Sequence, residues 1–596
     1  MASIAVPNPD AFVFGVSRSI SGRQWRWRGG PPGDAADALR LGISDVTARL
    51  FTARGVRVED IAALAQPTIR DLLPDPSIFR DMDTAAARIA DAVTRGEAVV
   101  IFGDYDVDGA TSAAVLIRFI RAVGGTVSHY IPDRLLEGYG PSAEALVALK
   151  RAGADLVVCV DCGTQGFEAL EAAKGAGLDV IVVDHHKAST LLPPAVAIVN
   201  PNRIDEDEGA AFGHLAAVGM AFLVAVAVNR ELRVRGWFSG RPEPKLTELL
   251  DLVALGTVAD VVPLTGLNRA YVSQGLKVMA TRRNAGLAAL AAAARLERAP
   301  RASDLGFALG PRINAGGRVG QADLGVRLLT GEGDELSALA DELNRLNDER
   351  RAIETLVTEA AIAACERAGN APIAVIAGDG WHPGVIGIAA SRLKDRFGVP
   401  ALVIGIDEAG TGKGSGRSIP GVDLGAAVLA ARDAGLISAG GGHAMAAGVT
   451  VARERVDDLA RFLCERLEGD VARARAVDAL SFDLALAPAG VTPALAEALE
   501  AAGPYGAGWP GPRVAAGPVS VVKADIVGTG HVRVILAGAD GARVKAVAFR
   551  SVDTPLGAAL MQAGGRRLWV SGRVSQDDWG STPRAELHLD DAAWAD

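Results

Sequence analysis

The stretch "IFGDYDVDGATS" at residues 101–112 carries aspartates at alternate positions, Asp104, Asp106 and Asp108. They come directly after the apolar run "AVVIF" at 98–102, which predicts a buried strand. Carboxylates two residues apart on an extended backbone project to the same side and repel one another. A buried strand end can hold such a group only when a cation lies among the carboxylates. The stretch therefore favours a metal site.

The composition is that of an ordinary globular protein. The chain has 596 residues, of which 49% are hydrophobic and 22% charged, and its net charge is −10. This length predicts three or four domains. The acidic balance argues against nonspecific coating of nucleic acid, although residues 501–596 are relatively basic. No window reaches the roughly 18–20 apolar residues of a membrane span, and the N-terminus lacks a signal-peptide pattern, so we expect a cytoplasmic protein.

Apolar runs and helical stretches then alternate along the chain. The runs "DLVVCVD" (155–161) and "LDVIVVD" (178–184) both end on an aspartate. Such alternation predicts a parallel sheet with helices on both faces, and ligands of such sheets bind beyond the carboxyl ends of the strands. Asp161 and Asp184 are therefore expected at the same sheet edge as the first three aspartates, where a metal site is the simplest explanation.

Further candidate ligands lie in "DHH" at 184–186 and in "LVALGTVADVVPL" at 252–264. Carboxylates with imidazoles suit manganese or magnesium, and two such ions can activate a water and stabilise the leaving oxygen of a phosphodiester. Cys159 and Cys162 lack the second ligand pair of a structural zinc site, so we interpret them as small strand-end residues. The metal candidates are Asp104, Asp106, Asp108, Asp161, Asp184, His185, His186 and Asp260.

The second half of the chain has a different organisation. Apolar residues at a three-to-four spacing predict one long helix over 334–368, which joins the first α/β region to a second one. Two glycine-rich stretches, "GTGKGSGRS" (410–418) and "AGGGHAMAAG" (439–448), predict turns, and "GSGRS" (414–418) in the first suits a backbone nest for a phosphate as well as it suits a flexible surface loop. Short alternating runs from about residue 515 predict a small barrel such as an OB-fold.

The predicted fold class is therefore α/β, with two α/β domains joined by a long helix and a C-terminal β-barrel. The first domain carries the parallel sheet. The expected divisions are an N-terminal segment at 1–80, the parallel-sheet domain at 81–333, the connector helix at 334–368, a second α/β domain at 369–470 and a nucleic-acid-binding barrel at 471–596.

The motifs "GDYDVDGATS", "VDCGT", "VDHH" and "ALGTVADVVPL" resemble, in this order, those of the DHH phosphoesterase superfamily, and above all its RecJ family. The segments "LGPRINAGGRVG" (309–320), "LNRLNDERRAIE" (343–354), "GWHPGVIGIAASRL" (380–393) and "GGGHAMAAG" (440–448) are also similar to RecJ segments. The resemblance spans roughly residues 85–590. It implies a DHH domain, a DHH-associated domain and an OB-fold.

The resemblance also implies an activity and the residues for it. RecJ proteins are 5′-to-3′ exonucleases specific for single-stranded DNA, with two Mn²⁺ or Mg²⁺ ions, and act in repair and recombination. Asp161 would bridge the ions, and His186 would contact the scissile phosphate or support the ligands. The implied catalytic residues are Asp106, Asp108, Asp161, His185, His186 and Asp260, and the implied metal ligands are Asp104, Asp106, Asp108, Asp161, His185 and Asp260.

Substrate contacts follow from the same resemblance. Ser415 and Arg417, together with Arg318 of "NAGGR", would bind the 5′-terminal phosphate, and His443 would face the metal site across a cleft. Single-stranded DNA is the expected partner of a monomeric enzyme, and a helicase or a single-strand-binding protein is the kind of protein partner it would have. "GAGWP" at 506–510 departs from the Gly-Asn-Pro usual in RecJ relatives.

Three other functions stay open at this point. Superfamily members that cut short oligonucleotides or cyclic dinucleotides are typically shorter chains without the connector helix and the barrel. An inactive DNA-binding scaffold would not need the full set of carboxylates, which this chain retains. A pyrophosphatase would not need a barrel.

Overall fold

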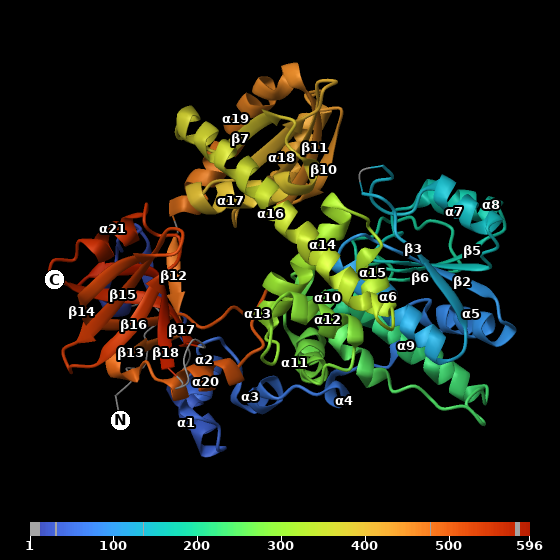
Figure 1. Ribbon diagram of the computed structural model, residues 1–596, viewed down its shortest axis with the longest axis horizontal. Coiled ribbons are helices and arrows are strands. Elements are labelled where there is room, and N and C mark those ends of the chain that lie inside the picture. The colour runs from blue at the N-terminus through green and yellow to red at the C-terminus, as the bar shows by residue number, and fades with distance from the viewer. Residues whose placement is uncertain (1–11, 30–31, 135, 477, 578–583, 596) are drawn as a thin grey trace.

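The computed structural model describes residues 12–29, 32–134, 136–476, 478–577 and 584–595. Figure 1 shows two α/β domains and a barrel, with the first helices of the chain running beneath the barrel and the first domain. The fold class is as predicted. Within the described residues, no helix combines the length and the hydropathy that crossing a membrane requires.

The first domain is built on a five-stranded parallel sheet in the order β3-β2-β4-β5-β6. Successive side chains along a strand pack in two separate cores on opposite faces of the sheet: Ile101 belongs to one hydrophobic cluster and Phe102 to the other. This is the period of two that an extended strand dictates. The strands are β2 (Ala98–Gly103), β3 (Thr126–Tyr130), β4 (Leu156–Val160), β5 (Asp179–Val183) and β6 (Ala197–Val199).

Helices cover both faces of this sheet, as expected. Helices α7 and α8 pack on one face, and α5, α6 and α9 on the other. The helices are α5 (Met82–Arg95), α6 (Val107–Ala122), α7 (Ala143–Arg151), α8 (Phe167–Gly175), α9 (Ala217–Val234), α10 (Leu250–Ala259), α11 (Gly266–Ala280), α12 (Ala285–Ala293), α13 (Ala302–Asp304), α14 (Gly310–Val319) and α15 (Leu324–Thr330).

A single helix, α16 (Glu335–Ala368), connects the first domain to the second, where the long helix was predicted. The second domain holds a five-stranded sheet in the order β10-β11-β9-β8-β7. Its elements are β7 (Ala374–Asp379), α17 (Pro383–Phe397), β8 (Ala401–Ile406), β9 (Thr411–Arg417), α18 (Leu424–Asp433), β10 (Ala439–His443), β11 (Ala446–Ala452) and α19 (Val456–Ala476).

The turn predicted at 410–418 is wrong, because this segment forms β9 in the middle of the second sheet. Its backbone pairs with β8 on one side and with β11 on the other, so it does not form the expected nest of free amides. The alternate glycines face the core: a Cβ at Gly414 would lie 2.5 Å from Val449 Cγ2, and one at Gly416 2.6 Å from Leu424 Cδ2. Close packing therefore requires these glycines.

The second predicted turn, at 439–448, is likewise a pair of strands. Strands β10 and β11 form an antiparallel hairpin in which His443 pairs with Ala446. A Cβ at Gly442, whose φ is +149°, would lie 2.3 Å from the Ala446 carbonyl oxygen. Composition alone predicts loops for such stretches, whereas here the absence of side chains lets neighbouring backbone approach.

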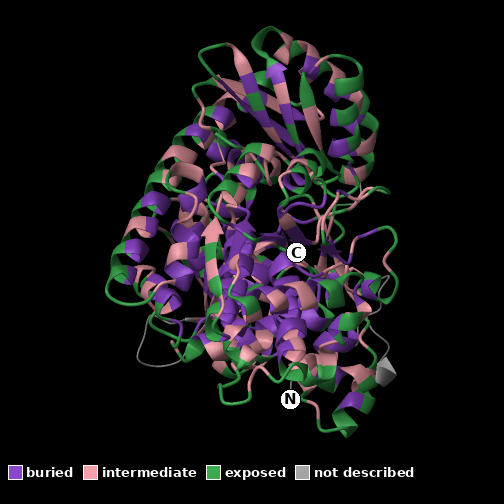
Figure 2. Cartoon of the chain, turned by 90° about the vertical axis from the view of Figure 1, so that its right-hand side faces the viewer, coloured by how far each residue is buried: buried purple, intermediate pink, exposed green. Residues whose placement is uncertain are grey.

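The C-terminal region forms a closed barrel. Strands β14, β15, β16, β18 and β17 pair in this order, and pairing of β14 with β17 completes the ring. Figure 2 shows buried residues concentrated inside the molecule. The elements are β12 (Ala479–Phe482), β13 (Leu484–Leu486), α20 (Pro493–Ala501), β14 (Val514–Val527), β15 (His531–Gly538), β16 (Arg543–Ala548), α21 (Pro555–Met561), β17 (Arg567–Asp577) and β18 (Arg584–Trp594).

The N-terminal segment ties the barrel to the first domain. Strand β1 (Gln24–Trp27) pairs in parallel with β12, and Trp25 packs against Phe482. Buried Arg269 of α11 donates hydrogen bonds to carbonyls from both regions, Leu64 (2.7 Å) and Ala502 (2.8 Å). The remaining helices are α1 (Pro32–Arg40), α2 (Asp45–Thr52), α3 (Val58–Ala65) and α4 (Ile69–Leu72).

Candidate metal centre

The opening aspartates follow β2 and start α6. Helix α6 begins at Val107, so Asp104, Asp106 and Asp108 do not share one extended backbone as the sequence suggested. Asp106 caps the helix by accepting a hydrogen bond from the Gly109 backbone N–H (3.1 Å). A Cβ at Gly109 would lie 2.4 Å from the Asp104 carbonyl oxygen. The tight turn into α6 therefore brings three carboxylates together at the strand end.

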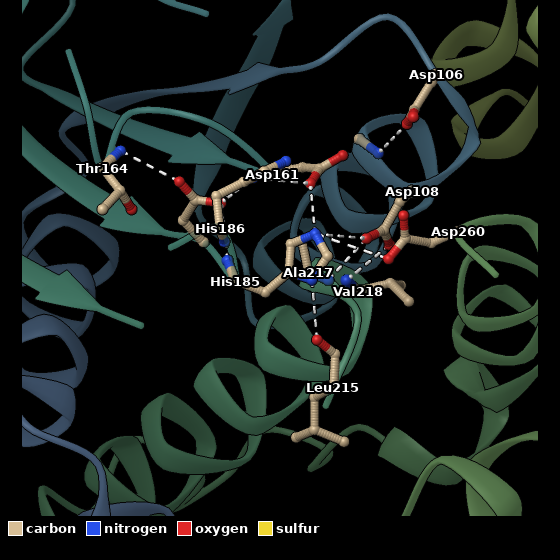
Figure 3. A network of polar contacts seen from close by, with 12 residues as sticks. Asp106, Asp108, Asp161, Thr164, His185, His186, Leu215, Ala217, Val218 and Asp260 are labelled. Atoms are coloured by element: carbon tan, nitrogen blue, oxygen red, sulfur yellow. Dashed lines mark hydrogen bonds and ion pairs between the residues drawn. The ribbon is translucent and has the colours of Figure 1, made fainter. Parts of the chain in front are cut away.

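Two backbone N–H groups hold the carboxylate of Asp108, one at each oxygen. Its two oxygens accept hydrogen bonds from the backbone N–H groups of Ala217 (2.7 Å) and Val218 (2.9 Å), at the start of α9. The positive end of a helix dipole favours a carboxylate there. Figure 3 shows Asp108 beside Asp260, the residue that ends α10. Three helices thus meet at this carboxylate.

Asp161 follows β4 and has a left-handed backbone with φ of 59°. A sparsely populated conformation costs a non-glycine residue about 1–3 kcal/mol, and such residues cluster at functional sites. Its N–H donates to the Val183 carbonyl (3.0 Å), and its own carbonyl accepts a hydrogen bond from the Tyr139 hydroxyl (2.9 Å). These two bonds hold Asp161 in the conformation that turns its carboxylate toward the other acids.

His185 presents a lone pair to three carboxylates. Its Nδ1 lies 3.0 Å from the Leu215 carbonyl, so Nδ1–H is the donor and Nε2 the bare nitrogen. Nε2 faces oxygens at 3.3–4.0 Å on Asp161, Asp260 and Asp108. Burial, and the neighbouring His186, lower the pKa of His185. A neutral nitrogen lone pair among carboxylates is repulsive unless a cation lies between them.

Asp184 supports the two histidines. Its carboxylate accepts hydrogen bonds from the backbone N–H groups of His185 (2.7 Å) and Thr164 (3.1 Å), and lies 2.7 Å from His186 Nδ1. Burial opposes a charge on His186, but the hydrogen bond to Asp184, together with the negative charges of Asp184 and the neighbouring aspartates, raises the pKa of His186. The oxygens of Asp184 are thus engaged, which leaves His185 and His186 to face the site.

The candidate ligands form three overlapping triads, in each of which the ligand atoms lie within 4.8 Å of one another. Asp161 belongs to two of them and His185 to two; a carboxylate has two oxygens for two cations, whereas His185 has one free nitrogen. The triads are Asp104, Asp106 and Asp161; Asp161, His185 and His186; and Asp108, His185 and Asp260. Seven of the eight sequence candidates therefore come together.

The electrostatics of this cluster fit divalent cations. Burial and then the neighbouring Asp106 raise the pKa of Asp104 to about 8 and of Asp108 to about 7. Burial and Asp108 raise the pKa of Asp260 to about 9, and the pKa of Asp161 is also raised. One buried oxygen each of Asp104 and Asp260 has no hydrogen-bond partner in the described residues. Carboxylates with imidazole, crowded and partly unsatisfied, are a donor set for Mn²⁺ or Mg²⁺.

Arginines from both α/β domains gather near this centre. Arg318 of α14 donates to the Gly384 carbonyl of α17 (2.6 Å), and a Cβ at Gly387, one turn further along α17, would lie 3.1 Å from Arg417 Nη2. Burial and then Arg134 lower the pKa of Arg318, to about 10, and that of Arg417. Arg134, Arg318 and Arg417 form what we call the arginine cluster. Ser415 joins it through a hydrogen bond from Arg417 (3.2 Å).

His443 does not join either group of residues. It is exposed at the end of β10, and its backbone lies against Gly425 of α18. No hydrogen bond or ion pair links it to the candidate ligands within the part of the chain described. Cys159 and Cys162 are buried in the core under α7 and α8 and belong to no cation triad among these residues.

Sequence reasoning missed Tyr139 and Arg134, which lie in the loop after β3. Tyr139 bonds Asp161 and also lies 3.2 Å from His186 Nδ1. A signal was available: the loop follows a strand of the same sheet, and glycines with φ of 85° and 79° flank Tyr139. Applying to β3 the rule that ligands gather beyond strand ends would have indicated this loop.

Each domain matches a known one. Residues 98–257 match the DHH family N-terminal domain, residues 370–469 the DHHA1 domain and residues 482–591 the RecJ OB domain. The parallel sheet with its acidic edge, followed by the second α/β domain, therefore defines a phosphoesterase of the DHH type.

Comparisons over the whole chain identify the family within this class of phosphoesterases. The single-stranded-DNA-specific exonuclease RecJ of Dickeya dadantii is 38% identical to this chain, over 85% of this chain and 89% of that protein. The single-stranded-DNA-specific exonuclease RecJ of Bacillus subtilis is 35% identical, over 93% of this chain and 68% of that protein. The chain belongs to the RecJ family. A crystal structure of RecJ with Mn²⁺ from Thermus thermophilus superposes with a TM-score of 0.75 at 29% identity, over 94% of this chain and 78% of that one. A crystal structure of exonuclease RecJ bound to manganese superposes with a TM-score of 0.56 at 33% identity, over 67% of this chain and 98% of that one.

Proposed function

We propose that this protein is an exonuclease specific for single-stranded DNA that hydrolyses phosphodiesters from the 5′ end with two Mn²⁺ or Mg²⁺ ions. The observation that carries the proposal is the sharing of Asp161 and His185 among overlapping triads of ligands. Family membership supports the exonuclease activity and its substrate. A connector helix and an OB domain, which the short-oligonucleotide enzymes lack, favour it over that alternative.

The ligand roles can be divided between two positions. Asp104 and Asp106 would hold one ion, Asp108, His185 and Asp260 the other, and Asp161 would bridge them. When bound, the ions acidify a water and stabilise negative charge on the leaving oxygen. The hydrogen bonds that α9 donates to Asp108 and that the His185 ring donates to Leu215 keep these side chains in place before substrate arrives.

His186 is suited to contact the scissile phosphate. Its Nδ1–H is engaged by Asp184 (2.7 Å), which leaves Nε2 for the substrate. Because its pKa is raised, the ring carries a positive charge over a wider pH range than an ordinary histidine. A cation beside the phosphate offsets the charge that builds up on its oxygens during hydrolysis.

The arginine cluster supports the 5′ polarity. A terminal phosphate carries more negative charge than an internal diester, and a guanidinium grips two of its oxygens at once. Arg318 and Arg417, with Ser415, would hold the 5′-phosphate, and Arg134 extends this set. Burial and then the neighbouring Arg134 lower the pKa of Arg318, and an anion would relieve the repulsion between these arginines.

Other properties belong to the same proposal. The OB domain would bind the incoming strand, as OB-folds do through a basic face. His443 would act from the second domain as a substrate contact. A cytoplasmic monomer that works with a helicase or a single-strand-binding protein is the form in which we expect the enzyme to function.

A digestion experiment tests the proposal. Strands labelled at the 5′ or the 3′ end, single or double, are incubated with Mn²⁺ or Mg²⁺. We expect early release of the 5′ label from single strands and little loss from blunt duplexes. Release of the 3′ label first would contradict the polarity, and equal digestion of duplexes would contradict the strand specificity.

A further inference from the structure

A cavity of about 380 Å³ lies where the N-terminal segment meets the loop that precedes the barrel. Arg28, Arg54 and Trp509 line it, and none of the metal candidates does. Glycines form part of its wall, and a Cβ at Gly55 would meet no atom within 4 Å. The cavity is therefore separate from the metal centre and has room for a small ligand.

Unpaired donors mark this cavity. The Arg54 side chain is 4% exposed, and its Nε lies 3.0 Å from Asp483. Its Nη1 and Nη2, and also Nε1 of Trp509, are buried without a hydrogen-bond partner in the described residues. Trp509 itself is 8% exposed. Leaving a buried donor unpaired destabilises a protein, most of all when the donor is charged. Three such donors beside one cavity point to a ligand that accepts hydrogen bonds.

The charges around the cavity are unbalanced. Arg28 Nε also pairs with Asp483 (2.9 Å), so one carboxylate serves two guanidinium groups. Arg269, whose guanidinium carbon lies 5.1 Å from the centre of the Trp509 ring, pairs with carbonyls alone among the described residues. Two guanidinium groups therefore share one aspartate, beside a third arginine that has no carboxylate partner among the described residues, and an anion in the cavity would offset the excess positive charge.

The tryptophan contributes its N–H rather than its ring. The guanidinium carbon of Arg54 lies 4.6 Å from the ring centre, and the Phe51 ring lies 5.1 Å away. With these groups and Arg269 around it, the ring has no free face on which a base could stack. Trp509 stands in "GAGWP", where the resemblance to RecJ relatives leads one to expect asparagine.

We propose that Arg28, Arg54 and Trp509 form a binding site for a phosphate group. The donors and the excess charge call for an oxyanion, and the choice of phosphate rests on the proposed function, since its substrate and its products both carry phosphates. The loop of Trp509 is joined to the segment after Asp260, because the Leu264 N–H donates to the Ala507 carbonyl (2.8 Å). A phosphodiester of the strand and a free phosphate are the two sources.

Titration with inorganic phosphate tests the site without any nuclease activity. Every chain carries Arg417→Ala, so that binding by the arginine cluster is weakened and any remainder is the same in all the chains compared, and acetate at matched ionic strength serves as the control anion. Trp509→Phe keeps the ring and removes one donor, and we expect about a 3- to 10-fold weaker affinity for phosphate, the scale of one hydrogen bond. Arg54→Lys should cost about 10-fold or more, since it removes a charged pair of donors.

Trp237→Phe is the matched control, because it removes an indole N–H that donates to the Val123 carbonyl (3.0 Å) far from the cavity. It should bind phosphate like its parent. Equal affinities of the Trp509→Phe and Trp237→Phe chains would overturn the proposal, and so would equal binding of phosphate and acetate by the parent.

The same chains distinguish the two sources. Their affinities for a labelled single strand are measured in EDTA over a series of salt concentrations. If the site takes a phosphodiester, the further variant Arg54→Gln, which removes the charge that Arg54→Lys keeps, weakens DNA binding and reduces the salt slope by about 0.7, the value for one phosphate contact on a single strand. If it takes free phosphate, DNA binding is unchanged while phosphate binding falls. Neither the phosphate titration nor the DNA-binding measurement depends on nuclease activity. A failure of the proposed function would appear in the digestion experiment and not in these two measurements.

Discussion

Replacing Tyr139 with phenylalanine tests how the metal centre is held in shape. The Tyr139 hydroxyl donates to the carbonyl of Asp161 (2.9 Å) and lies 3.2 Å from His186 Nδ1. It therefore contacts the backbone of the proposed bridging residue and the ring of its neighbour. Phenylalanine keeps the ring and removes these contacts, so the substitution isolates the hydroxyl.

The magnitude follows from those contacts. One neutral hydrogen bond contributes about 0.5–1.5 kcal/mol, which corresponds to about a 2- to 12-fold change in an equilibrium constant. Without the bond, Asp161 is freer to leave its left-handed conformation with φ of 59°, and the carboxylate is less well positioned for two ions. We expect affinity for Mn²⁺ and the rate of hydrolysis to fall by a factor in this range, with KM for DNA nearly unchanged.

Calorimetric titration with Mn²⁺ and single-turnover digestion measure these effects. Tyr130→Phe is the matched control, because it removes a hydroxyl that donates to Glu137 (2.6 Å) in the same region without contacting a candidate ligand. If Tyr139→Phe binds Mn²⁺ and cleaves DNA as well as the Tyr130→Phe chain does, the hydroxyl does not position Asp161 and the reasoning fails.

Three further predictions concern other parts of the molecule. Arg417→Ala should weaken binding of 5′-phosphorylated strands by about 1.5–3 kcal/mol, and that of 5′-hydroxyl strands much less; equal losses in a filter-binding assay would exclude end recognition. Metal affinity should rise with pH toward about 9, the pKa of Asp260, because raised pKa values mean that protons must leave before a cation binds; calorimetry that shows no dependence on pH would contradict this. The folded, metal-free chain also holds protons that the unfolded chain has already released, so its free energy of unfolding falls as the pH rises through these raised pKa values. Gly414→Ala should destabilise the second domain by about 1–3 kcal/mol through overpacking, whereas Gly441→Ala, with no atom within 4 Å of its Cβ, should not; chemical denaturation compares the two.

The clustering of the candidate ligands could be predicted because its signal is local. Asp161 directly follows a strand, and the histidines of "DHH" follow an aspartate at the end of another. Parallel strands place their carboxyl ends at one edge, so sequence order alone brings these residues together. What the pattern does not distinguish is a ligand from its support. Asp184 has the same position in its strand as Asp161, and only the backbone N–H groups around it show that its oxygens are engaged.

The glycine-rich strands could not be predicted, since their conformation depends on distant packing. In β9 the glycines at 412, 414 and 416 face side chains of β8, β11 and α18 at distances that exclude a Cβ. No property of the segment itself distinguishes this from a flexible turn. The same holds for the N-terminal segment, whose strand β1 finds its partner β12 far away in the chain, with Gln24 beside Ala479, and for Tyr139, which reaches Asp161 only through the fold.

The most direct test of the account is the number of Mn²⁺ ions bound by the full chain and by Asp161→Asn. Asparagine keeps the size of the side chain and tolerates a left-handed backbone, so the variant changes the charge at the bridge and little else. We expect two ions per chain in the wild type, and in the variant one ion at most together with loss of nuclease activity. Two tightly bound ions in the Asp161→Asn chain, or a wild-type chain that is fully active with one, would contradict it.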